Sequence, residues 1–383
     1  MGSYLLSHLH ALGGGVVGYL VPFLFVLSLV VFFHELGHFL VARLCGVRIL
    51  VFSIGFGPEI VGFNDRHGTR WKIATIPLGG YVKFFGDENA GSVPDTPRLD
   101  TMNASERAES FFFQPVLKRA AIVVAGPFAN FLLAIAIFAT IFMLYGRPTM
   151  SARVDTVQPG SPAAAAGFEP GDIVQSIDGK AIDSFEDMQR VVSDSAGESL
   201  KITVDRKGAP IELTATPQLK EVKDSFGNSH RMGILGITRS MAATDLKPHP
   251  MSPPRALLTG VEETWFVIDR TLNYIGGVVV GREAADQLGG PIRIAQISGE
   301  VASIGFVALI HLAAVLSVSI GLLNLFPIPL LDGGHLLFYS IEAMRGRPLS
   351  ERAQEVGFRI GLAIVVMLMI FATFNDIVHL RTS

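Results

Sequence analysis

The chain has 383 residues, of which 49% are hydrophobic and only 17% are charged. A soluble protein of this length carries about a quarter charged residues, so the composition indicates a membrane protein. The net charge of −3 disfavours nucleic acid as a partner, and the single cysteine, Cys45, excludes an intrachain disulfide.

Four uncharged or nearly uncharged runs approach or exceed the roughly 20 residues that a membrane-spanning helix needs. They cover residues 17–40, 120–145, 301–331 and 356–375. The first run has no basic residue before it and no small-residue cleavage site after it. We therefore expect it to stay in the protein as a membrane anchor, unlike a signal peptide.

Basic residues predict how these spans are oriented. Residues 1–42 contain no Lys or Arg, whereas such residues crowd the loop between the first two spans and the loop before the last span. The positive-inside rule then places both loops in the cytoplasm and both termini outside. The prediction is a multi-pass protein of the bacterial inner membrane, with residues 147–300 in the periplasm and residues near 34 and 332 towards the cytoplasmic side.

The first span contains the pattern His34-Glu35-Leu36-Gly37-His38. Histidines four residues apart lie about 40° apart around a helix, so both imidazoles project from one face and can bind one zinc ion. Glu35 lies about 100° further round, within reach of a water at the open metal position. The alternative is that these polar side chains only satisfy neighbouring helices.

A β-hairpin is predicted after the first span. Residues 71–76 alternate roughly, Gly79-Gly80 offers a turn, and Tyr81 opens a second apolar run. An exposed edge there could pair with an extended substrate strand, which predicts Gly79, Gly80 and Tyr81 as substrate-binding residues. The alternative is a hairpin that packs its aromatic side chains on the membrane surface.

Near the start of the second span, Gly126 and Asn130 have two interpretations. Small residues allow close helix packing, in which Asn130 bonds to a neighbouring helix. Alternatively, Asn130 lies close to substrate or zinc.

The stretch 147–240 is soluble in character. It reads as short strands and two helices, with turn residues between them, and Gly233-Ile234-Leu235-Gly236-Ile237 looks like a carboxylate-binding loop with its strand. Such an order is similar to a circularly permuted PDZ domain, which either captures C-termini or sterically excludes bulky substrates. After it, residues 255–281 mix aromatic and charged residues, which predicts an amphipathic helix within a periplasmic segment 241–300.

The end of the third span supplies the second half of a site. Asp332 follows two prolines, Pro327 and Pro329, at the membrane depth of the histidine pair. Because a catalytic zinc has three protein ligands and one open position, Asp332 is the expected third ligand, ahead of His335. Prolines break the helix, and irregular backbone at this depth indicates a cavity that water can enter.

Together these motifs resemble the site-2 protease family, in its RseP-type branch (regulator of sigma-E protease). The resemblance rests on the histidine motif, residues 76–83, Gly126 to Phe131, the PDZ-like stretch, and Asn324 through His335. It implies one Zn²⁺ per chain bound by His34, His38 and Asp332, with Glu35 as the catalytic base. It also implies that Asn324, Pro327 and Pro329 bind substrate.

The resemblance further implies a function in regulated intramembrane proteolysis. Expected substrates are single-span membrane proteins, such as an anti-sigma factor already shortened outside, and remnant signal peptides. The outside segment has room for one PDZ-like unit, whereas the best-known enterobacterial relative has two. A membrane-bound PDZ scaffold with a non-catalytic metal site is the alternative; a zinc transporter is disfavoured because the two halves of the site are unlike.

The predicted fold is therefore a polytopic α-helical membrane protein with four transmembrane helices. A membrane-associated β-hairpin or sheet follows the first helix, and an α+β PDZ-like domain is inserted on the periplasmic side. The predicted boundaries are 1–146 for the N-terminal membrane half, 147–240 for the PDZ-like domain, 241–300 for the amphipathic segment and 301–383 for the C-terminal membrane half.

Overall fold

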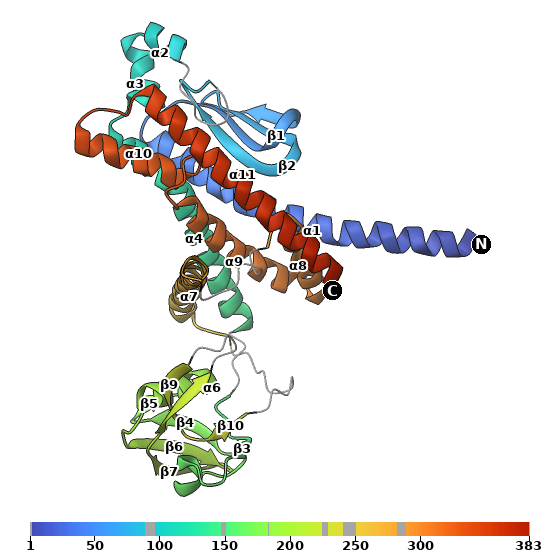
Figure 1. Ribbon diagram of the computed structural model, residues 1–383, viewed down its shortest axis with the longest axis vertical. Coiled ribbons are helices and arrows are strands. Elements are labelled where there is room, and N and C mark those ends of the chain that lie inside the picture. The colour runs from blue at the N-terminus through green and yellow to red at the C-terminus, as the bar shows by residue number, and fades with distance from the viewer. Residues whose placement is uncertain are drawn as a thin grey trace. The chain divides into compact units, whose positions relative to one another are not determined.

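The computed structural model describes residues 2–88, 96–146, 151–182, 184–223, 229–239, 250–281 and 289–382. The chain divides into two compact units (Figure 1). The first combines Met1–Ile141 with Pro253–Ser383, and the second is Phe142–Ser252.

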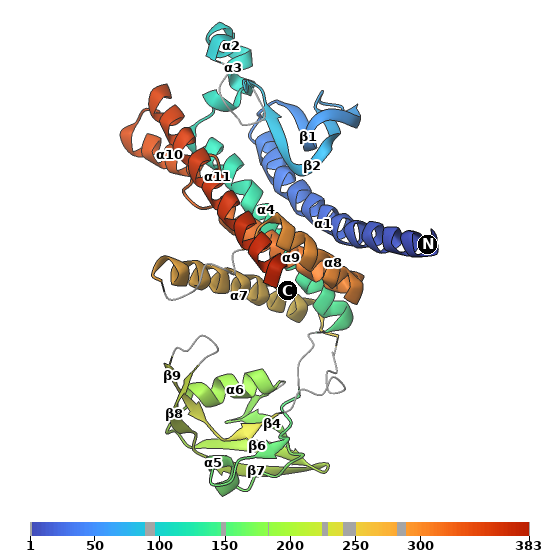
Figure 2. The ribbon, with the colours of Figure 1, turned by 45° about the vertical axis from the view of Figure 1, so that its right-hand side comes forward.

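Four helices of the first unit are long and apolar enough to cross a membrane, at Val17–Leu44, Val116–Tyr145, Phe306–Asn324 and Arg352–Val378. They belong to α1 (Gly2–Leu44), α4 (Val116–Tyr145), α9 (Phe306–Asn324) and α11 (Glu351–Thr382). The protein is a multi-pass membrane protein, as expected. Among these helices, α1 packs along α9 and along the shorter α8 (Pro291–Ile304) (Figure 2).

The predicted third span, 301–331, is wrong at both ends. Helix α8 ends at Ile304, and Gly305 separates it from α9 with φ of 146°, a backbone conformation that residues with a side chain rarely adopt. At the other end α9 stops at Asn324, before the prolines, and α10 (Asp332–Arg345) begins at Asp332. The absence of charged residues identifies the apolar stretch, whereas glycine and proline determine where the helix within it begins and ends.

The sheet after α1 is formed by β1 (Ile49–Asn64) and β2 (Arg70–Phe84). Residues 51–54 of β1 pair with residues 80–83 of β2 on one side and with residues 70–73 on the other. The chain reverses at residues 65–69, where Asp65 accepts hydrogen bonds from the backbone of His67 and Thr69. The predicted turn at Gly79-Gly80 is therefore wrong, since both glycines lie inside β2.

Short helices α2 (Thr96–Thr101) and α3 (Ala104–Glu109) and the 3-10 turn η1 (Phe111–Phe113) connect β2 to α4. Aromatic residues of α1, the sheet and η1 form a shared core. In it Phe52 packs on Phe39 and Trp71, and Phe84 stacks on Phe111 with ring centroids 4.9 Å apart. This core fixes the sheet against the end of α1 that carries the histidines.

Helix α7 (Pro253–Val279) also belongs to the first unit and is amphipathic. Ala256, Thr259 and Thr264 are buried, whereas Trp265 and Phe266 are 68% and 53% exposed. A single helix thus covers almost all of the predicted 255–281 stretch.

The second unit contains a four-stranded sheet with strand order β5-β4-β6-β7. Its elements are β3 (Thr156–Val157), α5 (Pro162–Ala165), β4 (Ile173–Ile177), β5 (Lys180–Ala181), α6 (Phe185–Asp194), β6 (Leu200–Arg206), β7 (Ala209–Ala215), β8 (Gln218–Lys223), β9 (Ser229–Ile234) and β10 (Ile237–Thr238). The short strands and two helices predicted for this stretch are present, whereas the β8–β9 hairpin was not predicted. A buried hydrophobic core packs between these elements, and Arg206 pairs with the fully buried Asp172 side chain.

Candidate metal and active site

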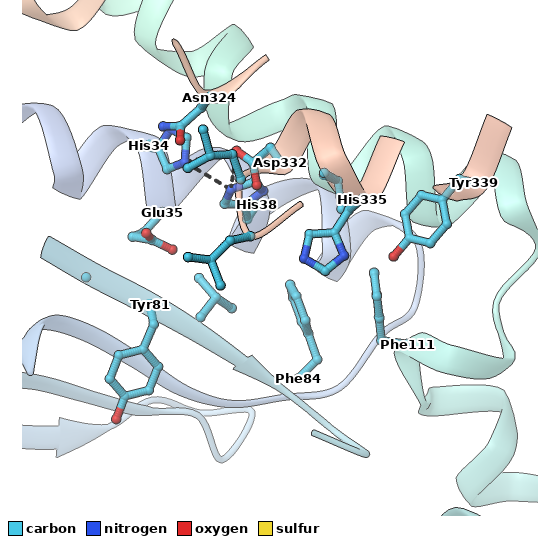
Figure 3. Close-up of a pocket in the computed structure, with 15 residues that line it drawn as sticks. His34, Glu35, His38, Tyr81, Phe84, Phe111, Asn324, Asp332, His335 and Tyr339 are labelled. Carbon is cyan, nitrogen blue, oxygen red and sulfur yellow. Dashed lines mark hydrogen bonds and ion pairs between the residues drawn. The ribbon is translucent and has the colours of Figure 1, made fainter. Parts of the chain in front are cut away.

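Helix α1 presents His34 and His38 on one face, as their spacing predicts (Figure 3). Their Nε2 atoms lie 3.3 Å apart, and His34 is buried. No acidic residue precedes them in α1, and Glu35 is the first charged residue of this helix. An apolar helix therefore places two metal-binding nitrogens and one carboxylate within two of its turns.

Asp332 meets the two histidines from the opposite half of the chain. It is the first residue of α10, and its Oδ2 lies 3.2 Å from His34 Nε2 and 3.5 Å from His38 Nε2. Among the described residues, these three form the group whose side-chain atoms could hold a metal ion. The Oδ2 atom is buried and forms no ordinary hydrogen bond.

This geometry fits zinc. Nitrogen and oxygen ligands bind zinc at about 2.0–2.1 Å, so neighbouring ligand atoms of a tetrahedral site lie about 3.3–3.4 Å apart. The three measured separations of 3.3, 3.2 and 3.5 Å match that edge length. Two imidazoles and one carboxylate also form a common donor set of catalytic zinc sites, which leave one position open.

Helix α4 lies directly behind the histidine pair. The backbone carbonyl of Ile122 lies 2.8 Å from His38 Nδ1, and the Asn130 amide nitrogen lies 3.3 Å from His34 Nδ1. Between them, a Cβ atom added to Gly126 would lie 2.3 Å from His38 Nε2. Asn130 therefore lies beside a histidine of the candidate metal group and also bonds to a neighbouring helix, because its backbone carbonyl accepts a hydrogen bond from Ser317 of α9.

A cavity of about 220 Å³ opens at this cluster (Figure 3). The predicted residues His34, Glu35, His38, Gly80, Tyr81, Asn324 and Asp332 line it. The other predicted substrate-binding residues, Gly79, Pro327 and Pro329, are not among its lining residues. His335, considered as a competing ligand, also lines it, whereas the other lining residues were not predicted as site residues: Val82, Phe84, Phe111, Val123, Leu330, Leu331 and Tyr339.

Strand β2 borders the cavity opposite the metal-binding group. A Cβ atom added to Gly80 would lie 2.8 Å from both Ser53 O and Val31 Cγ1, and 3.0 Å from Glu35 Cγ. Glycine at this position therefore lets the strand lie against α1 beside the carboxylate. The segment 80–83 pairs with β1 on one side, and no other strand among the described residues pairs with its second edge.

The loop between α9 and α10 is shaped by close backbone contacts. Cβ atoms added to Gly333 and Gly334 would lie 2.2 Å from Phe326 O and 2.5 Å from Ile328 O. Leu330 has φ of 102°, which is strained for a residue with a side chain. These contacts shape a tight loop before Asp332, and neither Pro327 nor Pro329 lines the cavity.

His335, one turn after Asp332, lines the same cavity but lies outside the three-residue metal group. Its ring points down from α10 and packs against Phe358, with ring centroids 5.5 Å apart (Figure 3). Next to it, Arg119 pairs with Glu342 at 2.6 Å and lies over the Tyr339 ring. The His335–Phe358 contact joins α10 to α11, and the Arg119 contacts fix α10 against α4.

The turn after β2 contains a buried acid. Asp87 is 4% exposed, and its Oδ2 accepts a hydrogen bond from the backbone of Phe84, a residue that lines the cavity. Burial raises the pKa of Asp87 to about 7. Its carboxyl group therefore titrates near neutral pH at one end of the strand that borders the cavity.

Comparisons with known proteins define the class of this site. The chain is 54% identical over 364 residues to "Putative zinc metalloprotease Atu1380" of Agrobacterium fabrum, covering 95% of this chain and 97% of that one. It is 43% identical over 380 residues to metalloprotease MmpA of Caulobacter vibrioides, covering 94% and 95% of the two chains. The PDZ domain of an SdrC-like protein from Listeria monocytogenes is a structural match at 23% identity with a TM-score of 0.19, covering 26% of this chain and 95% of that domain.

The molecule is a zinc metalloprotease with membrane-spanning helices, as its composition and histidine motif predicted. The family model of peptidase family M50 matches residues 22–368, and the chain belongs to that family. The predicted resemblance to site-2 proteases and the predicted zinc cofactor are thereby confirmed. The alternatives of a scaffold without catalysis and of a zinc transporter are set aside.

Proposed function

We propose that His34, His38 and Asp332 hold one zinc ion per chain and that Glu35 is the catalytic base. The observation that supports this assignment is the set of three ligand-atom separations, 3.2–3.5 Å, which match the edges of a tetrahedral zinc site. Zinc bound there supplies Lewis-acid polarisation of the scissile carbonyl and acidifies a water molecule.

The side chains divide the remaining chemistry among themselves. Glu35 lines the cavity one residue from His34, where it takes a proton from the attacking water and delivers it to the departing amine. Asn324 lines the same cavity and donates or accepts hydrogen bonds to the substrate backbone. Tyr81 and Val82 bring the free edge of β2 next to these groups, so an extended substrate segment can add as a further strand.

The substrate class proposed is a single-span membrane protein cut within or near its span. A membrane helix hides its amides, and strand addition at residues 80–83 supplies the partner groups that an unwound segment needs. An anti-sigma factor already shortened outside is the proposed physiological substrate, with remnant signal peptides as a second. This part is supported by the resemblance to the RseP-type branch.

We further propose that the protein lies in the bacterial inner membrane, with the termini and residues 147–240 in the periplasm. The concentration of Lys and Arg between the first two spans supports this orientation. The PDZ-like domain then acts as a filter against substrates with bulky outside domains. Its groove, lined by α6 and residues 233–237, is the proposed site for strand addition by a trimmed tail.

The test compares wild type with Glu35→Gln, both purified full-length in detergent. Bound zinc is measured by metal analysis, and cleavage is measured on a single-span model substrate. We expect about one zinc per chain in both proteins and cleavage only by the wild type. Loss of zinc in Glu35→Gln, or continued cleavage by it, would contradict the assigned role of Glu35.

A further inference from the structure

Helix α4 contacts both histidines through positions four residues apart. Ile122, Gly126 and Asn130 form one stripe on α4, and they face His38 and His34, which are themselves four residues apart on α1. Gly37 allows this approach, because a Cβ atom there would lie 2.2 Å from Ala125 O. Each Nδ1 atom of the histidine pair therefore meets a specific group of α4.

The protonation of the two imidazole rings determines which groups can face their Nδ1 atoms. A neutral imidazole that offers Nε2 to a metal carries its proton on Nδ1, which then needs an acceptor. For His38 the acceptor is the Ile122 carbonyl oxygen at 2.8 Å. For His34, the polar group at Nδ1 is the Asn130 side-chain amide, at 3.3 Å.

The proton on His34 Nδ1 also determines how the Asn130 side-chain amide is oriented. An Nδ1–H facing an amide NH₂ would set two donors against each other. The Oδ1 of Asn130 is buried without a hydrogen-bond partner, and the two ends of an amide have nearly the same shape. Turning the amide by 180° about its last bond places Oδ1 on the His34 proton.

We propose that Asn130 is a positioning residue that accepts the Nδ1–H hydrogen bond of His34 through Oδ1. This bond fixes the tautomer and the ring plane, so that Nε2 faces the metal together with His38 and Asp332. The inference rests on the proposed zinc site. It assigns to a side chain on α4 the same task that a backbone carbonyl performs for His38.

The surroundings of Asn130 hold it in place. The residue is fully buried, and its backbone carbonyl accepts a 2.9 Å hydrogen bond from the Ser317 hydroxyl. Helix α9 comes close because Gly321 has no side chain, and a Cβ atom there would lie 3.0 Å from Asn130 Cβ. A rigid acceptor of this kind is what keeps a metal-binding imidazole in one orientation.

The experiment measures zinc affinity by competition with a chelator, in full-length protein in detergent. Asn130→Leu has no acceptor, and we expect it to bind zinc about 10- to 100-fold more weakly. Asn130→Asp keeps an acceptor but no donor, and we expect affinity close to wild type. Ser317→Ala is the matched control, because it removes a hydrogen bond to the backbone of Asn130 and leaves the side-chain acceptor in place, so its affinity should be unchanged.

Two further readouts separate this inference from mere packing. In the cobalt-substituted protein, Asn130→Leu should change the visible absorption bands, whereas Asn130→Asp and Ser317→Ala should not. In wild type with ¹⁵N-labelled histidine, NMR should show the His34 proton on Nδ1, assigned by its loss in His34→Gln. This measurement needs no folded Asn130 variant.

Wild-type zinc affinity in folded Asn130→Leu would overturn the inference, as would a His34 Nδ1 that carries no proton in the zinc-loaded wild type. Equal weakening in Asn130→Asp and Asn130→Leu would also overturn it, because the amide would then act as a donor or a spacer. His34→Ala and Asp332→Ala test the underlying zinc site separately. If neither releases zinc, the proposed metal site fails, whatever Asn130 does.

Discussion

Gly126→Ala should destroy the zinc site while leaving helix α4 intact. A Cβ atom at this position would lie 2.3 Å from His38 Nε2 and 2.5 Å from its Cε1, whereas ordinary contacts begin at 3.4 Å. The ring must therefore retreat by about 1.1 Å. Metal–ligand distances tolerate shifts of only about 0.2 Å, so a retreat of this size removes one ligand.

The retreat also disturbs the 2.8 Å contact between His38 Nδ1 and the Ile122 carbonyl. Loss of an outer partner alone costs about 10- to 100-fold in metal affinity. With the ligand displaced as well, we expect a loss of at least about 100-fold, which corresponds to about 3 kcal/mol. Alanine favours a helix more than glycine by about 1 kcal/mol, so α4 itself should not be weakened.

The assay is chelator competition for zinc, with cleavage and apparent Tm measured on the same preparations. Gly18→Ala is the matched control on α1, because a Cβ atom there meets nothing within 4 Å. It should keep wild-type zinc affinity and cleavage. The reasoning is refuted if folded Gly126→Ala binds zinc and cleaves substrate as the wild type does.

Three further outcomes are expected. Burial raises the pKa of Asp87 from 3.8 to about 7, so the folded state loses stability as the pH rises between those values, by at most about 4 kcal/mol. Asp87→Asn should abolish this pH dependence, which is measured as Tm from pH 4 to 8. Arg206→Met should leave the Asp172 carboxylate without its cation, so the amides of β6 should exchange hydrogen faster in the full chain, and unchanged protection would contradict this. Tyr81→Pro should abolish cleavage without loss of zinc, whereas Tyr81→Phe should retain both; equal loss of zinc would count against strand addition.

The sequence predicted the parts of the site that depend on local geometry. The spacing of His34 and His38 determines their common face in any helix, and the depth of two spans was enough to bring Asp332 near them. Asn130 was left between two interpretations, because its neighbour depends on how α4 lies against α1. Such a register is set by many contacts far apart in the chain, and no local pattern encodes it.

The failed turn prediction has a physical cause in the same helix. Gly79-Gly80 carries the composition of a turn, but Gly80 is glycine because β2 lies against Val31 and Glu35 of α1. The true reversal, at residues 65–69, also has a local signal, since Asp65 bonds to the backbone of Thr69 and Gly68 has φ of 83°. Both segments contain glycine, and only the packing of the sheet shows which of them is the turn.

Three glycines around the histidine motif each allow a neighbouring backbone or ring to approach closely. Gly37 lets α4 reach α1, Gly126 makes room for the His38 ring, and Gly80 lets β2 reach Glu35. In each case a methyl group would lie within 3 Å of a neighbouring backbone or functional atom. The α1 part of the proposed metal site is thus fixed by the backbones of α4 and β2, which approach more closely than side chains would permit. With the backbones in these positions, the three ligand atoms lie at the separations of a tetrahedral zinc site.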